Sequence, residues 1–353
     1  MITFQNVTKT YPGGTTAVNN LNLTVEEGSF TVFVGPSGCG KTTSMRMVNK
    51  MIDPTSGVIK VGGKDIANIP AVPHRLGIGY VLQHAGLLPH RNVLDNVAQV
   101  LRLKGVDKKT ARSKAREALD RVSLDPALVD RYPAQLSGGQ QQRVGVARAL
   151  AADPPVLLMD EPFSAVDPVV REELQDEMLR LHRELKKTII FVTHDIDEAL
   201  RLGDKIAVFA PGGVMLQYAE PERVLTRPAN DFVQQLLGRD RGFRSLSFRD
   251  ALTFANGEKL PLTPLGPVVD GAHAVTPEWR LKVDASGVPK KWVDAAGKEF
   301  AVGTATRQAG GSLRLTLDSV LSSPGDFGLV VDAAGKAVGT IASRDVYALL
   351  DQK

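Results

Sequence analysis

The sequence predicts an α/β domain with a largely parallel sheet, followed by a small α+β domain. Residues 30–34, 156–159 and 188–192 are almost entirely apolar, as strands buried on both faces of a sheet are. Helical patterns alternate with these segments, which is the rhythm of βα units. After about residue 238 the chain becomes rich in Gly, Pro and short strand patterns, so a second domain begins there.

The composition fits a globular protein of two domains. Its 353 residues accommodate two domains of about 100 to 200 residues. The net charge of +4 is small and no block of Lys and Arg stands alone, so we expect no nucleic-acid partner. The single cysteine, Cys39, excludes an internal disulfide and a multi-cysteine metal site. No apolar run approaches the roughly 18 residues that cross a bilayer and no secretory signal is evident, so we expect a cytoplasmic location.

The first domain, residues 1–238, contains two smaller regions. Residues 58–66 predict a hairpin around a glycine pair, and therefore an antiparallel β subdomain beside the main sheet. Between about residues 84 and 155 the pattern is helical, which predicts a helical subdomain. Residues 239–353 form the second domain.

A phosphate-binding loop follows the strand at 30–34. Residues 35–42 fit the pattern G-x-x-x-x-G-K-[ST] and lead into a helix. Backbone N–H groups of such a loop wrap a phosphate at a helix N-terminus, where Lys41 adds positive charge and Thr42 a magnesium ligand. Cys39 then fills space in the loop and is not a nucleophile. The residues predicted to bind ATP here are Gly35, Pro36, Ser37, Gly38, Cys39, Gly40, Lys41, Thr42 and Thr43.

Two later strands end in residues that can act on a phosphate. Asp160 and Glu161 follow the strand at 156–159, which predicts a magnesium ligand and a carboxylate that polarises the attacking water. Taken alone, an acidic pair after a strand fits a helix cap equally well. His194 follows the strand at 188–192, and its imidazole can contact the γ-phosphate and hold Glu161 and water in line. We therefore predict Glu161 and His194 as catalytic.

A second helix start has the chemistry of an anion site. Ser137, Gly138, Gly139 and Gln140 precede a helical pattern with an apolar face, so a capping serine and two glycines lie at a helix N-terminus. One γ-phosphate is not easily held by two distant helix starts of the same chain. We therefore expect this helix start to face ATP bound to another copy, in a homodimer.

Together the sequences LSGGQ, GPSGCGKTT, VLLMDEP and FVTHD resemble the ATP-binding cassette (ABC) family over residues 1 to about 238. The resemblance implies that Tyr11 stacks on adenine and that Gln83 joins Thr42 and Asp160 around Mg²⁺. It also implies that the loop 164–167, which ends in Asp167, contacts the partner cassette. Val166 stands where the family usually has Leu.

In that family two cassettes close head to tail on ATP, and hydrolysis reopens them. A single cassette without a membrane span is similar to the motor subunit of an importer. That similarity implies a transmembrane permease, an extracytoplasmic substrate-binding protein and a peripheral location on the cytoplasmic face of the plasma membrane.

Residues 47–66 and 78–98 look most similar to ATPases of glycine betaine, carnitine and choline importers. An importer for methionine, a sugar or a polyamine is the alternative. A non-transport cassette ATPase is a further one, although such proteins typically carry a second cassette, zinc cysteines or long coiled coils.

The second domain contains a weak internal repeat. Residues 281–294 and 329–341 share a strand, an Asp-x-x-Gly turn and another strand, and resemble regulatory modules of the cystathionine-β-synthase type. Residues 339–345 approach the element with which those modules bind adenosine nucleotides, so Asp345 is a candidate regulatory ligand, although Ala342 stands where Thr or Ser is usual. A packing or dimerisation domain is the other interpretation.

Overall fold

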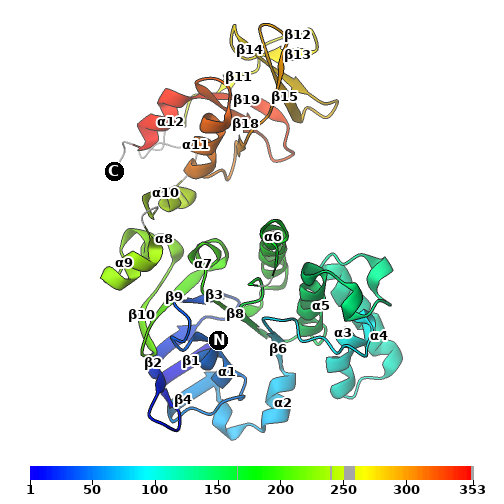
Figure 1. Cartoon of the computed structure of the whole chain (residues 1–353), viewed down its shortest axis with the longest axis vertical. Coiled ribbons are helices and arrows are strands. Elements are labelled where there is room, and N and C mark those ends of the chain that lie inside the picture. The colour runs from blue at the N-terminus through cyan, green and yellow to red at the C-terminus, as the bar shows by residue number, and fades with distance from the viewer. Residues whose placement is uncertain (165, 239–240, 250–258, 351–353) are drawn as a thin grey trace. The chain divides into compact units, whose positions relative to one another are not determined.

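The computed structural model of the chain divides into two compact units, Met1–Leu237 and Gly238–Lys353 (Figure 1). It describes residues 1–164, 166–238, 241–249 and 259–350. The domain boundary expected from the sequence lies one residue further along the chain. Among the residues described, no helix is both long and apolar enough to span a bilayer.

A six-stranded sheet forms the centre of the first unit. Its strand order is β10-β9-β3-β8-β7-β6, and every neighbouring pair is parallel except β10 with β9. The strands are β3 (Phe30–Val34), β6 (Ile78–Val81), β7 (Val156–Asp160), β8 (Thr188–Thr193), β9 (Lys205–Ala210) and β10 (Val214–Ala219). The three strands predicted from apolar segments are confirmed as β3, β7 and β8, and they are neighbours in the sheet.

A separate antiparallel sheet, in the order β2-β1-β4-β5, confirms the predicted hairpin around the glycine pair. Its strands are β1 (Ile2–Thr10), β2 (Thr16–Val25), β4 (Ser56–Val61) and β5 (Lys64–Asp65). The helices of the unit are α1 (Lys41–Val48), α2 (Ala71–Leu76), α3 (Val93–Leu103), α4 (Lys108–Arg121), α5 (Gly138–Leu150), α6 (Pro168–Leu185), α7 (Ile196–Leu202), α8 (Pro221–Thr226) and α9 (Asp231–Leu237). Short 3₁₀ turns are η1 (Ile66–Asn68), η2 (Pro126–Leu128) and η3 (Pro133–Gln135).

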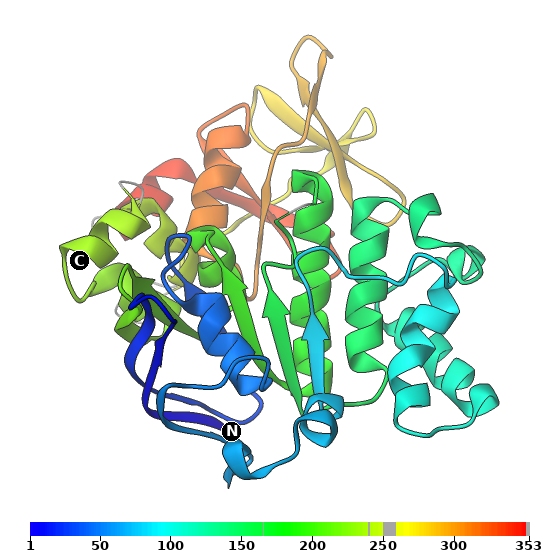
Figure 2. The same ribbon diagram turned by 60° about the horizontal axis from the view of Figure 1, so that its bottom comes forward.

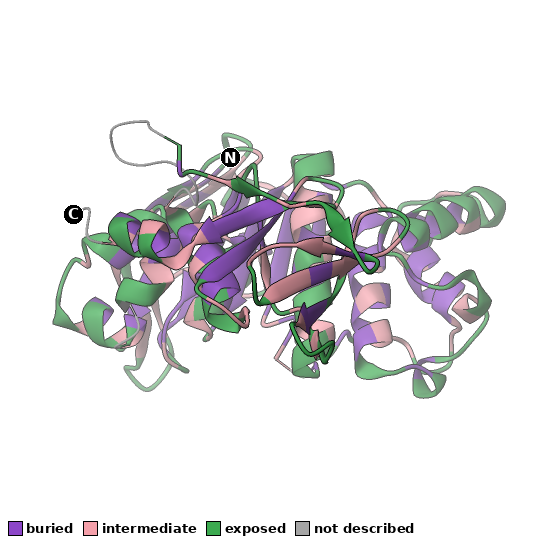
Figure 3. Cartoon of the chain, turned by 90° about the horizontal axis from the view of Figure 1, so that it is seen from above, coloured by how far each residue is buried: buried purple, intermediate pink, exposed green. Residues whose placement is uncertain are grey.

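Each face of the central sheet belongs to a different hydrophobic core. Along β7, Val156 and Leu158 belong to one core, while Leu157 and Met159 belong to the other, because successive strand residues point to opposite faces. Buried residues of α1 and the antiparallel sheet share the first core. Helices α3 to α7 share the second. Figure 2 shows that α1 and α5 are well separated. In Figure 3 the helices carry buried residues on one side and exposed residues on the other, as amphipathic helices do.

The second unit contains two small sheets. One has the order β11-β19-β18-β17 and packs with helices α11 and α12, and the other has the antiparallel order β12-β13-β14-β15-β16. The elements are α10 (Arg241–Ser245), η4 (Leu246–Phe248), β11 (Thr263–Pro264), β12 (Val268–Val269), β13 (Ala272–Ala274), β14 (Trp279–Val283), β15 (Pro289–Asp294), β16 (Glu299–Ala301), β17 (Ala305–Arg307), α11 (Leu313–Ser322), β18 (Phe327–Val331), β19 (Ala337–Ala342) and α12 (Ser343–Leu350).

The two predicted repeats are hairpins with the same turn but different surroundings. In both turns an aspartate side chain, Asp284 or Asp332, accepts backbone N–H groups, and a glycine with positive φ, Gly287 or Gly335, completes the turn. The first hairpin lies in the all-antiparallel sheet, whereas the second is followed by α12 and preceded by α11. The likeness between the repeats is therefore confined to the hairpin.

Two glycines of the first unit pack against the same carbonyl group. A Cβ atom at Gly40 or Gly213 would lie 2.0 or 2.4 Å from the carbonyl oxygen of Ala17, and both glycines have positive φ. Gly40 ends the phosphate loop and Gly213 lies in the turn between β9 and β10. Close backbone approach therefore requires glycine at both positions.

We predict that Gly213→Ala destabilises the first unit more than Gly212→Ala does. Both residues have positive φ, which costs an alanine about 1–2 kcal/mol, but a Cβ at Gly212 meets no atom within 4 Å. At Gly213 the backbone of Ala17 must also move, which adds about 1–3 kcal/mol. Chemical denaturation of both variants measures the difference, and equal losses of stability would contradict the close approach.

Candidate functional site

Three adjacent parallel strands place the predicted phosphate loop and the two predicted catalytic residues at one edge of the sheet. The order β3-β8-β7 places the phosphate loop after β3, His194 after β8 and Glu161 after β7. The carboxyl ends of these parallel strands share one edge, and open α/β sheets bind their ligands at that edge.

The phosphate loop ends at the N-terminus of α1. Gly40 is the N-cap residue with φ 93°, and Gly38 has positive φ with open space where a Cβ would be. Lys41 is 4% exposed, and its ammonium donates to the carbonyl oxygens of Gly35 (2.7 Å) and Pro36 (2.8 Å). Ser37 is exposed, whereas Thr43 is partly buried in α1. A buried ammonium beside a helix N-terminus fits an anionic ligand.

Two of the three predicted magnesium ligands, Thr42 and Asp160, touch. The Thr42 hydroxyl donates to Oδ1 of Asp160 over 2.7 Å, and the Arg46 guanidinium lies 3.7 Å from Oδ2. Burial raises the pKa of Asp160 above its ordinary value, against the lowering effects of Thr42 and Arg46. Hydroxyl and carboxylate oxygens are ligands that Mg²⁺ prefers, so the pair fits the ion.

Glu161 and His194, the two predicted catalytic residues, also contact each other. Nδ1 of His194 lies 3.0 Å from Oε2 of Glu161. Glu161 has φ 45°, in the left-handed region that is strained for a non-glycine residue. Its backbone N–H donates to the carbonyl of Val192 (2.9 Å), and its carbonyl accepts the Ser164 hydroxyl (2.9 Å). These bonds hold the carboxylate at the end of β7, 20% exposed.

The second predicted anion site is a capped helix start. The Ser137 hydroxyl accepts the N–H of Gln140, and the Gln140 side chain accepts the N–H of Ser137, which is a capping box at the start of α5. Ser137 and Gly138 are exposed, and Gly139 is buried. Helices α1 and α5 contribute to the hydrophobic cores on opposite faces of the sheet.

The remaining predicted residues are exposed residues of the first unit or lie in the second. Tyr11 is 37% exposed, with the Lys9 ammonium 5.3 Å from its ring centroid. Gln83 is exposed in the turn after β6, and Asp167 is exposed as the N-cap of α6. Ala165 of the loop 164–167 lies outside the described residues. Asp345, in the first turn of α12, pairs with Arg344 at 3.7 Å.

Sequence reasoning missed two residues around Asp160. Arg46 lies one helical turn beyond Thr42 on α1, so the i, i+4 spacing could have identified it. Tyr80 lies on β6, beside β7, and its burial and the nearby Asp160 raise its pKa to about 12. No sequence pattern identifies this tyrosine, because its proximity to Asp160 depends on which strands are neighbours.

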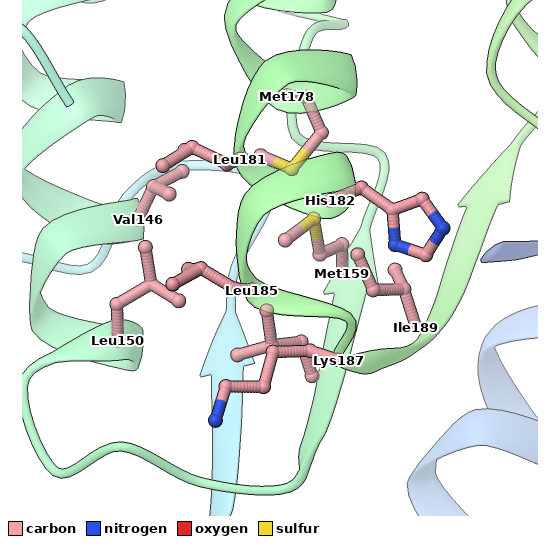
Figure 4. A pocket seen from close by; sticks show the side chains of 10 residues that line it. Val146, Leu150, Met159, Met178, Leu181, His182, Leu185, Lys187 and Ile189 are labelled. Atoms are coloured by element: carbon pink, nitrogen blue, oxygen red, sulfur yellow. The ribbon is translucent and has the colours of Figure 1, made fainter. Parts of the chain in front are cut away.

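A small cavity elsewhere in the first unit is apolar and contains none of the predicted site residues (Figure 4). It lies between α5, α6 and the sheet and is lined by Val146, Leu150, Leu157, Met159, Met178, Leu181, His182, Leu185, Lys187 and Ile189. Its lining offers a phosphate few donors, so it does not compete with the loop after β3.

Comparisons with known proteins agree with the motifs. The family model described as ABC transporter matches residues 18–164. The osmoprotectant import ATP-binding protein OsmV of Salmonella typhimurium is 40% identical in an alignment that covers 99% of this chain and 95% of that protein. The choline transport ATP-binding protein OpuBA of Bacillus subtilis is 48% identical over 247 residues, which cover 70% of this chain.

The alignment with the choline transport protein covers 65% of that protein, slightly less than two thirds of its length. Among solved structures, a dimeric ATP-binding cassette in a post-hydrolysis state, bound to ADP and Pi, is similar with a TM-score of 0.58 and 34% sequence identity. The similarity covers 63% of this chain and 99% of that one. The predicted fold class, with its cassette core and additional C-terminal domain, is thereby confirmed.

We predict that Cys39 resists thiol reagents in the folded protein. The side chain is 1% exposed, and burial raises its pKa, an effect that the nearby Lys41 only partly offsets. Near pH 8 the thiolate fraction should therefore lie below that of a free cysteine. Labelling with a disulfide reagent should be slow in buffer and complete in guanidinium chloride. Equally fast labelling in both would contradict the buried position.

Proposed function

Because the chain belongs to the family of ABC transporter ATP-binding proteins, we propose that it is the ATP-hydrolysing motor subunit of an importer. The proposed cargo is a quaternary-amine osmoprotectant such as glycine betaine, carnitine or choline. The observation that carries the ATPase activity is the convergence of Lys41, Glu161 and His194 on adjacent strand ends. The choice of cargo is supported by the names of the relatives.

Each residue has a defined part in the proposed reaction. The loop from Gly35 to Gly40 and the Lys41 ammonium bind the phosphates, and Tyr11 packs against adenine. Glu161 accepts a proton from the water that attacks the γ-phosphate, while His194 orients the Glu161 carboxylate. Thr42, Gln83 and Asp160 would hold Mg²⁺, which supplies charge neutralisation on the phosphates.

We infer that the active form is a head-to-tail homodimer. Helices α1 and α5 pack in the cores on opposite faces of the sheet, so two separate helices of one chain each offer a helix start, and one phosphate is not easily held by both. A second copy can supply α5 to the loop of the first, with Asp167 in the contact. The dimeric state of the similar cassette bound to ADP and Pi supports this arrangement.

The transport role requires further proteins. A transmembrane permease would hold the cassettes at the cytoplasmic face of the plasma membrane, and an extracytoplasmic binding protein would deliver the solute. The second unit would regulate or assemble the motor, and the match to OsmV over 99% of this chain supports its being part of the same system. Asp345 is the candidate contact for a regulatory nucleotide.

We predict that Glu161→Gln leaves ATP binding intact and lowers kcat at least about 100-fold, because the base that accepts the proton is lost. The variant should also accumulate as an ATP-bound dimer. Phosphate release, nucleotide binding and molecular mass measure these three properties. Glu184→Gln is the matched control, because the same change removes a half-exposed carboxylate on α6; it should hydrolyse ATP normally. Parental turnover by Glu161→Gln would overturn the assignment of the base.

We also predict that the full chain, reconstituted with its permease and binding protein, hydrolyses ATP faster when a quaternary amine is present. Vesicles should accumulate labelled glycine betaine, carnitine or choline only with ATP and Mg²⁺. Methionine, a polyamine and a sugar serve as comparison solutes. Stimulation and uptake by one of these, with none by the quaternary amines, would retain the motor and contradict the cargo.

A further inference from the structure

His194 lies in a short turn that the Thr193 side chain closes. The Thr193 hydroxyl accepts the backbone N–H of Asp195 over 3.0 Å, so it links the residues before and after His194. The same hydroxyl donates to Oε2 of Glu198, in α7, over 2.6 Å. Thr193 and Glu198 are 2% and 6% exposed, so water does not compete for this bond. The hydroxyl thus uses its one hydrogen on a carboxylate and a lone pair on the turn.

The carboxylate beneath the turn is itself held by α6. Oε1 of Glu198 lies 3.4 Å from Nε2 of Gln175, whose Oε1 accepts the Arg201 guanidinium over 3.0 Å. Burial raises the pKa of Glu198, and the hydrogen bond from Thr193 acts in the opposite direction. A buried carboxylate costs stability unless it is well bonded, and an apolar side chain would fill the same space. Packing alone therefore does not explain the residue.

A second set of contacts fixes the far side of the turn. The Asp195 carboxylate caps α7 by accepting the N–H groups of Asp197 (2.8 Å) and Glu198 (3.4 Å). The Arg171 guanidinium of α6 lies 3.9 Å from Asp195 and donates to the carbonyl of Val166 over 3.3 Å. The turn is therefore joined to the loop before α6 as well as to α7.

The His194 ring has little packing of its own, because its side chain is 56% exposed. Its position depends on the backbone turn and on the 3.0 Å contact with Glu161. We propose that Thr193 and Glu198 are positioning residues for hydrolysis: the buried carboxylate orients the hydroxyl, and the hydroxyl closes the turn that holds His194 against Glu161. This inference rests on the proposed function, in which that pair acts on ATP.

Thr193→Val tests the inference, because valine keeps the shape of threonine and removes the hydroxyl. In the full chain kcat should fall about 10- to 100-fold, the loss expected when a reacting group is misplaced by a fraction of an ångström to 1 Å. The KM for ATP should stay within about twofold, because the phosphate loop is untouched. Thr193→Ser restores the hydroxyl and should recover most of the turnover. Glu198→Ala removes the acceptor and should reproduce the kcat loss.

Thr306→Val is the matched control. Thr306, in the second unit, is 0% exposed and its hydroxyl bonds that of Thr316 over 2.8 Å. The substitution therefore deletes an equally buried hydroxyl away from the His194 turn. It should leave kcat unchanged, whereas a general sensitivity of turnover to buried hydroxyl groups would lower kcat in both valine variants.

A double-mutant cycle separates positioning from stability. If Thr193 acts through His194, Thr193→Val should cause no further loss in a His194→Ala background, since the group that it positions is absent. Should the residual turnover of His194→Ala fall below detection, ¹⁵N spectra replace the cycle. The His194 ring signal, assigned by its loss in His194→Ala, should shift in Thr193→Val and return in Thr193→Ser.

The outcomes distinguish this inference from the proposed function. If the parent chain releases no phosphate from ATP, the proposed function is wrong. A parent chain that hydrolyses ATP, together with a Thr193→Val variant that matches it in kcat, overturns the positioning role alone. Equal losses from Thr193→Val with and without His194, or an unchanged ring signal, would overturn it as well.

Discussion

Parallel pairing of β3, β8 and β7 is the constraint on which the rest of the site depends. The pairing aligns the carboxyl ends of three strands that are far apart in sequence. It brings Thr42 within 2.7 Å of Asp160 and His194 within 3.0 Å of Glu161. All three strands are fully buried, so a slip in register would cost much of the core as well as the site.

The two faces of this sheet carry the two helices whose starts take part in the proposed ATP site. One face carries α1 and so the phosphate loop, and the other carries α5 and so the capped serine helix. In the proposed function each of these two helix starts supplies one half of a phosphate site. Two copies related by a twofold axis would then complete two sites, as the proposed homodimer requires.

The contiguous motifs were predictable because each is a local pattern with its own physical reason. The phosphate loop needs glycines at set spacings, and Gly40 shows that the reason includes the fold, since its neighbour Ala17 leaves no room for a Cβ. Three strands of the central sheet were also predictable, because strands buried on both faces are uniformly apolar. Tyr80 and the bond between Thr193 and Glu198 were not predictable, because they depend on side-chain directions that no spacing encodes.

The second unit shows a different limit to what can be predicted from the sequence. The repeated Asp-x-x-Gly turn was predicted from the sequence. In the structure Asp284 and Asp332 accept the same backbone N–H groups in their two turns. The elements that pack against each hairpin could not be predicted, because a turn does not specify whether its neighbour is a helix or a strand. Gly339 illustrates the point: a Cβ there would lie 2.4 Å from the carbonyl oxygen of Thr263 in β11, so strand packing alone explains the glycine.

The central claim is that one copy's phosphate loop works with another copy's α5. Mixing two inactive full-length variants tests it most directly. Lys41→Ala lacks a working loop and Ser137→Arg a working helix start, but a mixed pair contains one site in which both are intact. The account predicts that the mixture releases phosphate faster than the sum of the separate variants. Release no faster than that sum, under conditions in which the parent chain is active, would contradict it.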